Sequence, residues 1–216
     1  NIIEKITSRT KWINLLELHG LIKYFIQNNK SIYLPYHNYS HTLGFLYHAL
    51  AAGMREFGTD KKKLQELGVA VIFHDFNHSG GKYEDEVNIR FALDALRNCP
   101  KEYFPSGYEN FSVAEDLIKS TQYPYIINDE DLSQQQKIMR DCDILWIIDS
   151  SSLIQNILGL GTEMSFKGEI HELIDNHKKF VIESAKTFRT GYAMDVFDSL
   201  KSSWEFRLNQ FINNIK

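Results

Sequence analysis

Apolar residues recur along most of this chain with the period of an amphipathic helix. The segment 11–29 carries them at positions 12, 15, 16, 18, 22, 25 and 26, and this spacing predicts a helix ending near Asn28 and Asn29. The pattern resumes over 36–57. Pro35 separates the two segments, because proline disfavours a helical conformation in the residue before it. Both segments are predicted to be helices with one buried face.

The same reasoning predicts helices over most of the remaining chain, at 61–75, 84–98, 109–121, 131–149, 168–190 and 192–214. Thr59 or Asp60 is expected to cap the first of these. A buried strand at 69–73 is an alternative that a short apolar run leaves open, and 151–161 is ambiguous. With no series of alternating strands and no low-complexity linker, the sequence predicts an all-α fold in one domain, residues 1–216.

The most informative polar residues follow the apolar run 69–73. His74 and Asp75 are adjacent at its end, and His78 comes one helical turn later. Ionisable side chains beside a buried segment are costly unless something compensates them, and a bound metal ion is a common compensation. This stretch therefore predicts a metal site, with Ser79, Gly80 and Gly81 expected to end the helix that carries it.

Two other stretches supply residues of the same chemical types. His37 and His41 are four residues apart on a predicted helix and are expected to share a face. Asp141 and Asp143 precede a run of apolar residues. Taken one at a time, the histidine pair and either aspartate are typical of ordinary surface or core positions. In order along successive helices, they offer three or four ligands to a divalent ion and leave positions open for water and substrate.

Composition narrows the range of functions. The chain has 216 residues, of which 43% are hydrophobic and 24% charged, so it can build a core. Its net charge of −4 does not favour binding to duplex nucleic acid, whose backbone is negatively charged, although small phosphorylated ligands remain compatible with it. No apolar run reaches membrane-spanning length, which predicts no membrane partner. Two distant cysteines, Cys99 and Cys142, are typical of a reduced, cytoplasmic protein.

The ordered set of histidines and aspartates resembles the HD-domain metal-dependent phosphohydrolases. A closer likeness is to the catalytic domain of the class I cyclic-nucleotide phosphodiesterases, which carry a YHNxxH element and an HDxxHxG element. Residues 36–41 read YHNYSH and residues 74–80 read HDFNHSG, so each defining position is matched. The motifs lie between 36 and 143, about half of the chain.

The resemblance implies a role for each matched residue. His41, His74, Asp75 and Asp143 would bind a tight, zinc-like metal, with Asp141 as the competitor of Asp143 for the last place. Asp75 would also bridge to a second ion, magnesium or manganese, held otherwise mainly by water. His37 would be the general acid that protonates the leaving oxygen, and His78 would orient the water network around the reacting phosphate.

The resemblance also implies the reaction. A hydroxide held between the two metals would attack a 3′,5′-cyclic nucleotide and give the 5′-monophosphate. Thr121 lies where the family has a threonine near the metals, but Gln122 replaces the acidic residue that often follows it. The base-binding glutamine has no clear counterpart, and the context of Gln210 is that of an ordinary closing helix. Alternatives are therefore an HD-type phosphohydrolase acting on another nucleotide phosphoester, such as a nucleoside monophosphate, a dinucleotide or an alarmone, and a non-catalytic metal-binding sensor module.

Overall fold

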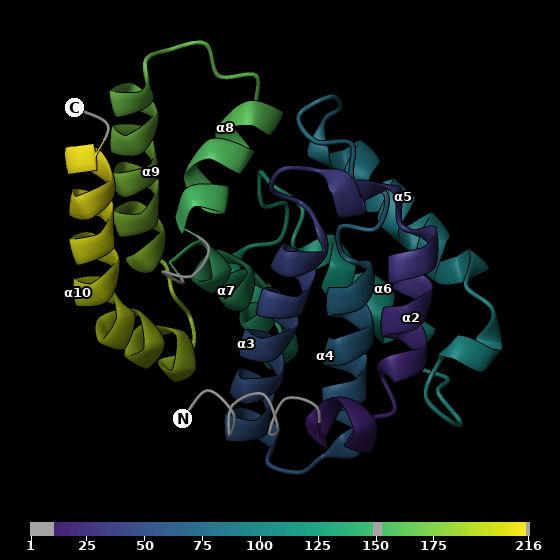
Figure 1. Cartoon of the computed structure of the whole chain (residues 1–216). Coiled ribbons are helices and arrows are strands. Elements are labelled where there is room, and N and C mark those ends of the chain that lie inside the picture. Colours follow the sequence, from purple (N-terminus) through teal and green to yellow (C-terminus); the bar gives the residue numbers. More distant parts are fainter. Residues whose placement is uncertain (1–10, 149–152, 215–216) are drawn as a thin grey trace.

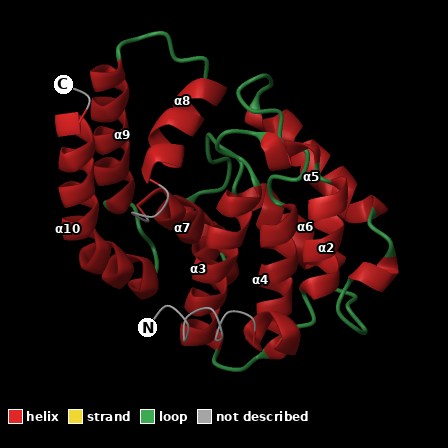
Figure 2. Cartoon of the chain, in the orientation of Figure 1, coloured by secondary structure: helices red, strands yellow, loops and turns green. Residues whose placement is uncertain are grey.

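A computed structural model of the chain describes residues 11–148 and 153–214. Within these ranges the regular secondary structure is helical and no residue is in a strand, which confirms the all-α fold class (Figure 2). None of the helices described is long and apolar enough to span a membrane. The predicted helix end at 149 and residues 151 and 152 lie outside the described ranges.

The longer helices match the predicted segments to within a few residues. Their bounds are α2 His19–Asn28, α3 Tyr39–Phe57, α4 Lys61–Phe73, α5 Asp85–Asn98, α6 Phe111–Ser120, α7 Gln134–Ile148, α9 Ile170–Ala185 and α10 Gly191–Asn214. Shorter helical turns connect them, including η1 Lys30–Tyr33, η2 Lys101–Tyr103, η3 Asp129–Asp131 and α8 Leu160–Glu163. The ambiguous segment 151–161 contains a π-helical turn, η5 Gln155–Gly159, that continues into α8.

The prediction of one continuous helix over 11–29 is wrong, because the helix is broken in the middle. Residues 11–15 are helical, a turn follows at 16–18, and α2 begins only at His19. Glu17 adopts a left-handed conformation with φ of 59°. The backbone N–H of Leu18 donates to the carbonyl of Ile13, a bond typical of a helix that ends at a left-handed residue. The carboxylate of Glu17 accepts from Lys61 and from the Ser106 N–H, which compensates for the strain.

The core forms where α3, α4 and α7 pack side by side, with α2, α5 and α6 covering the far side of α4 (Figure 1). The apolar half of α4 is fully enclosed from Leu67 to Phe73, which explains why that segment lacks a polar face. Helices α3 and α7 approach closely at Gly44, where a Cβ atom would lie 2.0 Å from the ring of Trp146. This packing brings the start of α3, the end of α4 and the middle of α7 together.

Helices α9 and α10 lie next to each other on the opposite side of α7 from α4 (Figure 1). They pack on α7 and reach back to α3 and η5. Helix α8 lies between this pair and the loop that precedes α3. Residues from both groups of helices line the cavity that is described below.

Candidate metal centre

The YHNYSH motif sits across the start of α3. Asn38 is the N-cap, and its side chain accepts a hydrogen bond from the Ser40 N–H. His41 is therefore in the first turn and His37 precedes the helix. The expectation that His37 and His41 share a helical face is wrong. The two rings are nevertheless close, with centroids 5.8 Å apart, because the extended residue at the cap turns His37 back over the helix end.

The HD motif sits at the end of α4. The helix ends at Phe73 with His74 as its C-cap, so the strand alternative is wrong and the predicted stop at Ser79–Gly81 is too late. Asp75 and His78 lie in the turn that follows, where Asn77 has a φ of 62°. The motif residues are thus placed by a tight turn beyond a buried helix, and not by a continuous helical face.

Four side chains from α3, α4, the turn after α4 and α7 meet at one point. The Nε2 atoms of His41 and His74 are 3.1 Å apart. The Oδ2 atom of Asp75 lies 3.1 Å from His41 Nε2 and 2.9 Å from His74 Nε2. The Oδ1 atom of Asp143 lies 3.3 Å from His41 Nε2. The structure therefore brings together the four residues that the resemblance assigns to the tight metal.

These separations fit a divalent cation. With bonds of about 2.1 Å to nitrogen and oxygen, neighbouring ligand atoms lie about 3.0 Å apart in an octahedron and about 3.4 Å apart in a tetrahedron. His74 Nδ1 lies 2.7 Å from the carbonyl of Val71, which can only accept, so Nδ1 carries a proton. In the neutral ring, Nε2 then presents a lone pair to Asp75 Oδ2, and a cation between the two relieves their repulsion.

The electrostatics of the cluster favour positive charge at the same point. Burial disfavours the charged form of His41, but hydrogen bonds and charges from Asp143 and Asp75 outweigh it and raise its pKa to about 10. Burial likewise opposes ionisation of Asp75, yet the positive histidines around it hold its pKa well below the ordinary value. A divalent ion would supply the positive charge that these two carboxylates favour.

The environments of Asp141 and Asp143 differ, which bears on their competition for the last ligand position. Asp141 is fully buried and points away from the cluster. Its Oδ2 accepts from the N–H groups of Arg189 and Thr190 and from the Thr190 hydroxyl, and its Oδ1 pairs with Arg189 Nη1. Asp143 is partly exposed and faces His41. Asp141 therefore has a structural environment, and Asp143 is placed to ligate.

His37 is held by a residue that sequence reasoning missed. Its Nδ1 lies 2.5 Å from Oε2 of Glu163, at the end of α8. The other carboxylate oxygen, Oε1, accepts from the backbone N–H groups of Tyr36 and His37. Because the carboxylate accepts from Nδ1, the other ring nitrogen is left free for a reacting group. Glu163 is 126 residues away in the sequence and belongs to no motif, so no local signal could have identified it.

His78 lies against His37, with ring centroids 3.7 Å apart and planes inclined by 24°. Burial and the neighbouring His37 lower the pKa of His78 to about 4, so its ring is neutral near pH 7. Its Nδ1 accepts from the Gly80 N–H, which places the proton of the neutral ring on Nε2. Asp75 lies close to His37 and His78 as well as to the first cluster, so it stands between the two.

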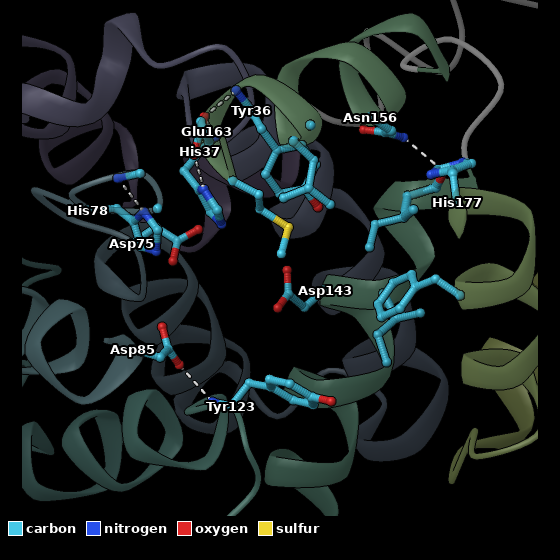
Figure 3. A pocket seen from close by; sticks show the side chains of 18 of the residues that line it. Tyr36, His37, Asp75, His78, Asp85, Tyr123, Asp143, Asn156, Glu163 and His177 are labelled. Atoms are coloured by element: carbon cyan, nitrogen blue, oxygen red, sulfur yellow. Dashed lines mark hydrogen bonds and ion pairs between the residues drawn. The ribbon is translucent and has the colours of Figure 1, made fainter. Parts of the chain in front are cut away.

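The cluster opens into a cavity of about 970 Å³ (Figure 3). Asp75 and Asp143 face it from two sides. Thr121 lies on its wall. Asp85 is a second residue that the sequence analysis missed. It accepts from the Tyr123 N–H, and burial together with the charges of Asp75 and Asp143 raises its pKa. A third carboxylate thus lines the cavity.

Several residues considered from sequence lie elsewhere. Gln210 is exposed on α10 and does not line the cavity, nor does Gln122. His19 and His171 are exposed, and His48 is buried beside the hydroxyl of Tyr192. His177 is buried and lines the cavity.

In comparisons with known proteins, no protein-family model matches the chain, and no curated protein sequence is significantly similar to it.

Proposed function

We propose that this protein is a metal-dependent phosphodiesterase that hydrolyses a 3′,5′-cyclic nucleotide to the 5′-monophosphate. The observation that carries the proposal is the position of His37. Its ring is fixed by Glu163, stacks on His78, and borders the same cavity as the carboxylates of Asp75 and Asp143. A site that only binds metal has no need of a positioned proton donor beside it.

The residues that would hold the metals are His41, His74, Asp75 and Asp143 for the first ion and Asp75 for the second. When bound, two divalent ions supply neutralising charge for the phosphate and a water of lowered pKa as the nucleophile. Attack of water on phosphorus would form one P–O bond and break the bond to the 3′ oxygen. His37 gives a proton to the departing 3′ oxygen, a step that contributes about 10²- to 10⁴-fold.

Glu163 and His78 support this proton transfer without touching the reacting atoms. The carboxylate of Glu163 fixes the ring of His37 and offsets the positive charge that the ring carries before it donates. The neutral His78 presents an Nε2–H donor beside Asp75, suited to ordering water next to the phosphate. Glu163 is a positioning residue, and replacing it by Gln should lower kcat about tenfold or more with little change in KM.

Product analysis tests the proposal. The purified protein, with manganese or magnesium, is incubated with cyclic AMP, cyclic GMP and a panel of linear nucleotides, and the products are separated by chromatography. We expect a 5′-monophosphate from a cyclic substrate. His37→Ala should reduce turnover by about 10²- to 10⁴-fold while its metal content stays that of the wild type. His19→Ala, an exposed histidine outside the cavity, is the matched control and should be unaffected.

The alternatives give different results in the same experiment. The cavity volume is near the upper end of the range for small-molecule sites, which favours a larger nucleotide phosphoester as the second candidate substrate. Turnover of linear nucleotides alone would support that phosphohydrolase. Metal binding without turnover of any compound would support the sensor module, and unchanged activity in His37→Ala would contradict the role of His37.

A further inference from the structure

The turn that carries Asp75 and His78 has an unfavourable backbone conformation. The His78 N–H donates to the Asp75 carbonyl across it. Between these two residues, Asn77 has a φ of 62°, a left-handed conformation that residues other than glycine rarely adopt. Such a conformation persists where the surrounding structure supports it. The shape of the turn therefore depends on residues outside it.

That support comes from Asn29, which lies between α2 and η1. Its Oδ1 atom accepts a hydrogen bond from the backbone N–H of Asn77 at 2.7 Å. The Oδ1 atom of Asn77 in turn accepts from the backbone N–H of Lys30 at 3.0 Å. Two asparagines that are 48 residues apart thus each accept from the backbone of the other segment. The left-handed residue is held both by its N–H and by its side chain.

Ser31 extends this contact to Asp75 itself. The Ser31 hydroxyl lies 2.9 Å from Asn29 Oδ1 and 3.1 Å from the carbonyl oxygen of Asp75. It has a single hydrogen, so it donates to one of these oxygens at a time. The Ser31 N–H also donates to Asn29 Oδ1, at 3.0 Å. Asn29 and Ser31 are only 4% and 1% exposed, so water competes little for these bonds.

The other half of the Asn29 amide shows which atom of the side chain the structure uses. Its Nδ2 atom is enclosed and has no hydrogen-bond partner within residues 11–148 and 153–214. In the reversed orientation of the amide, the NH2 group would face two backbone N–H groups, so the oxygen belongs where it is. An enclosed donor without an acceptor is costly. The acceptor Oδ1 is therefore what accounts for an asparagine at this position.

We infer that Asn29 is a positioning residue for the candidate metal centre, acting through the turn after α4. It holds the turn so that the Asp75 carboxylate lies within 3.1 Å of two histidines of the cluster, while His78 lies against His37. Figure 3 shows Asp75 and His78 close together at the cavity. The inference rests on the proposed function, because it takes the cluster to bind metal ions. A turn that already has its bound shape spares binding the cost of ordering it.

Calorimetric titration with Mn²⁺ tests the inference without requiring turnover. Asn29→Leu has a similar volume but no acceptor, and it should bind Mn²⁺ about 10- to 100-fold more weakly than the wild type. Asn29→Asp retains the acceptor and removes the unpaired donor. Because a carboxylate surrounded by N–H donors is stabilised, this variant should keep the wild-type affinity within about threefold. Rescue by Asp but not by Leu is the result that a general effect on packing would not give.

Two further variants separate positioning from a loss of stability. Leu21→Ala removes a fully buried side chain of α2 two turns before Asn29, so it destabilises the same helix through the core. Asn28→Leu removes the neighbouring exposed amide, which donates only to the Tyr24 carbonyl within α2. Both proteins should bind Mn²⁺ as the wild type does, under conditions in which urea unfolding shows them to be folded.

Wild-type Mn²⁺ affinity in a folded Asn29→Leu protein would overturn the inference, as would an equal loss of affinity in Leu21→Ala. If Asn29→Leu does not fold, Ser31→Ala removes only the hydroxyl beside Asp75 and should weaken Mn²⁺ binding about tenfold. Hydrolysis of bis(4-nitrophenyl) phosphate reports on the proposed function separately. Mn²⁺ binding that depends on Asn29 without hydrolysis of any diester would contradict the proposed function and support the inference, whereas hydrolysis with unchanged Mn²⁺ affinity in Asn29→Leu would do the reverse.

Discussion

At the scale of single residues, Asp141 and Asp143 show how two similar side chains take different roles. They are two positions apart on α7, so they point to different sides of the helix. Asp141 lies in the core and accepts hydrogen bonds from the backbone N–H groups of Arg189 and Thr190, while Asp143 faces His41. The sequence offered both as ligands, because it contains no information on which side of α7 meets α3.

This difference predicts separate effects of two conservative substitutions. Asp143→Asn should lower metal content strongly and leave the fold intact, because the side chain is partly exposed and its neighbours are candidate ligands. Asp141→Asn should keep the metal but lower the free energy of unfolding by about 3–5 kcal/mol, because it leaves Arg189 and buried N–H groups without their charge partner. Metal analysis and urea unfolding measure the two properties. If Asp141→Asn loses metal and Asp143→Asn does not, Asp141 is the ligand and the two assignments are reversed.

At the scale of elements, the site depends on how closely α3 and α7 approach each other. Gly44 lies one turn after His41, and Trp146 lies one turn after Asp143, so the close contact between glycine and indole lies next to both candidate ligands. The sequence predicts both helices, but the need for a glycine in the middle of α3 becomes clear only from the packed pair.

Gly44→Ala should therefore disturb both stability and metal binding. Its Cβ would overlap the Trp146 ring, and overpacking of this kind costs about 1–3 kcal/mol of unfolding free energy. Gly191→Ala is the matched control. A Cβ there meets only Arg55 at 3.5 Å, and we expect a change within about 0.5 kcal/mol. Urea titration and metal affinity measure the effects, and equal behaviour of the two variants would show that the helix contact does not position the ligands.

At the scale of the whole molecule, the cavity joins two groups of helices. The candidate metal cluster is built by α3, α7 and the end of α4, while α9, which carries His177, lines the cavity across from it (Figure 3). The glutamate that fixes His37 comes from α8, which links these parts. His177, which is buried on α9, makes the stability of the molecule depend on pH.

Because the pKa of His177 falls from 6.5 in the unfolded chain to about 4 in the fold, the unfolded state binds more protons between these values. Its contribution to stability is complete above pH 6.5 and is lost as the pH falls toward 4. Between pH 7 and pH 5 this loss amounts to about 2 kcal/mol. Unfolding of His177→Leu should show a smaller decrease over that interval than the wild type or His171→Leu. An identical decrease in all three proteins would contradict a buried, neutral His177.

The sequence by itself determined the helices and the residues that form the candidate metal cluster. Helical periodicity is a local property, and adjacent His74 and Asp75 at the end of an apolar run are costly without a cation wherever the chain folds. The resemblance favoured Asp143 over Asp141, but only the tertiary structure gave the two their different partners, joined Glu163 to His37 and placed His177 on the cavity wall. These outcomes depend on contacts between residues far apart in sequence, which no spacing along the chain encodes.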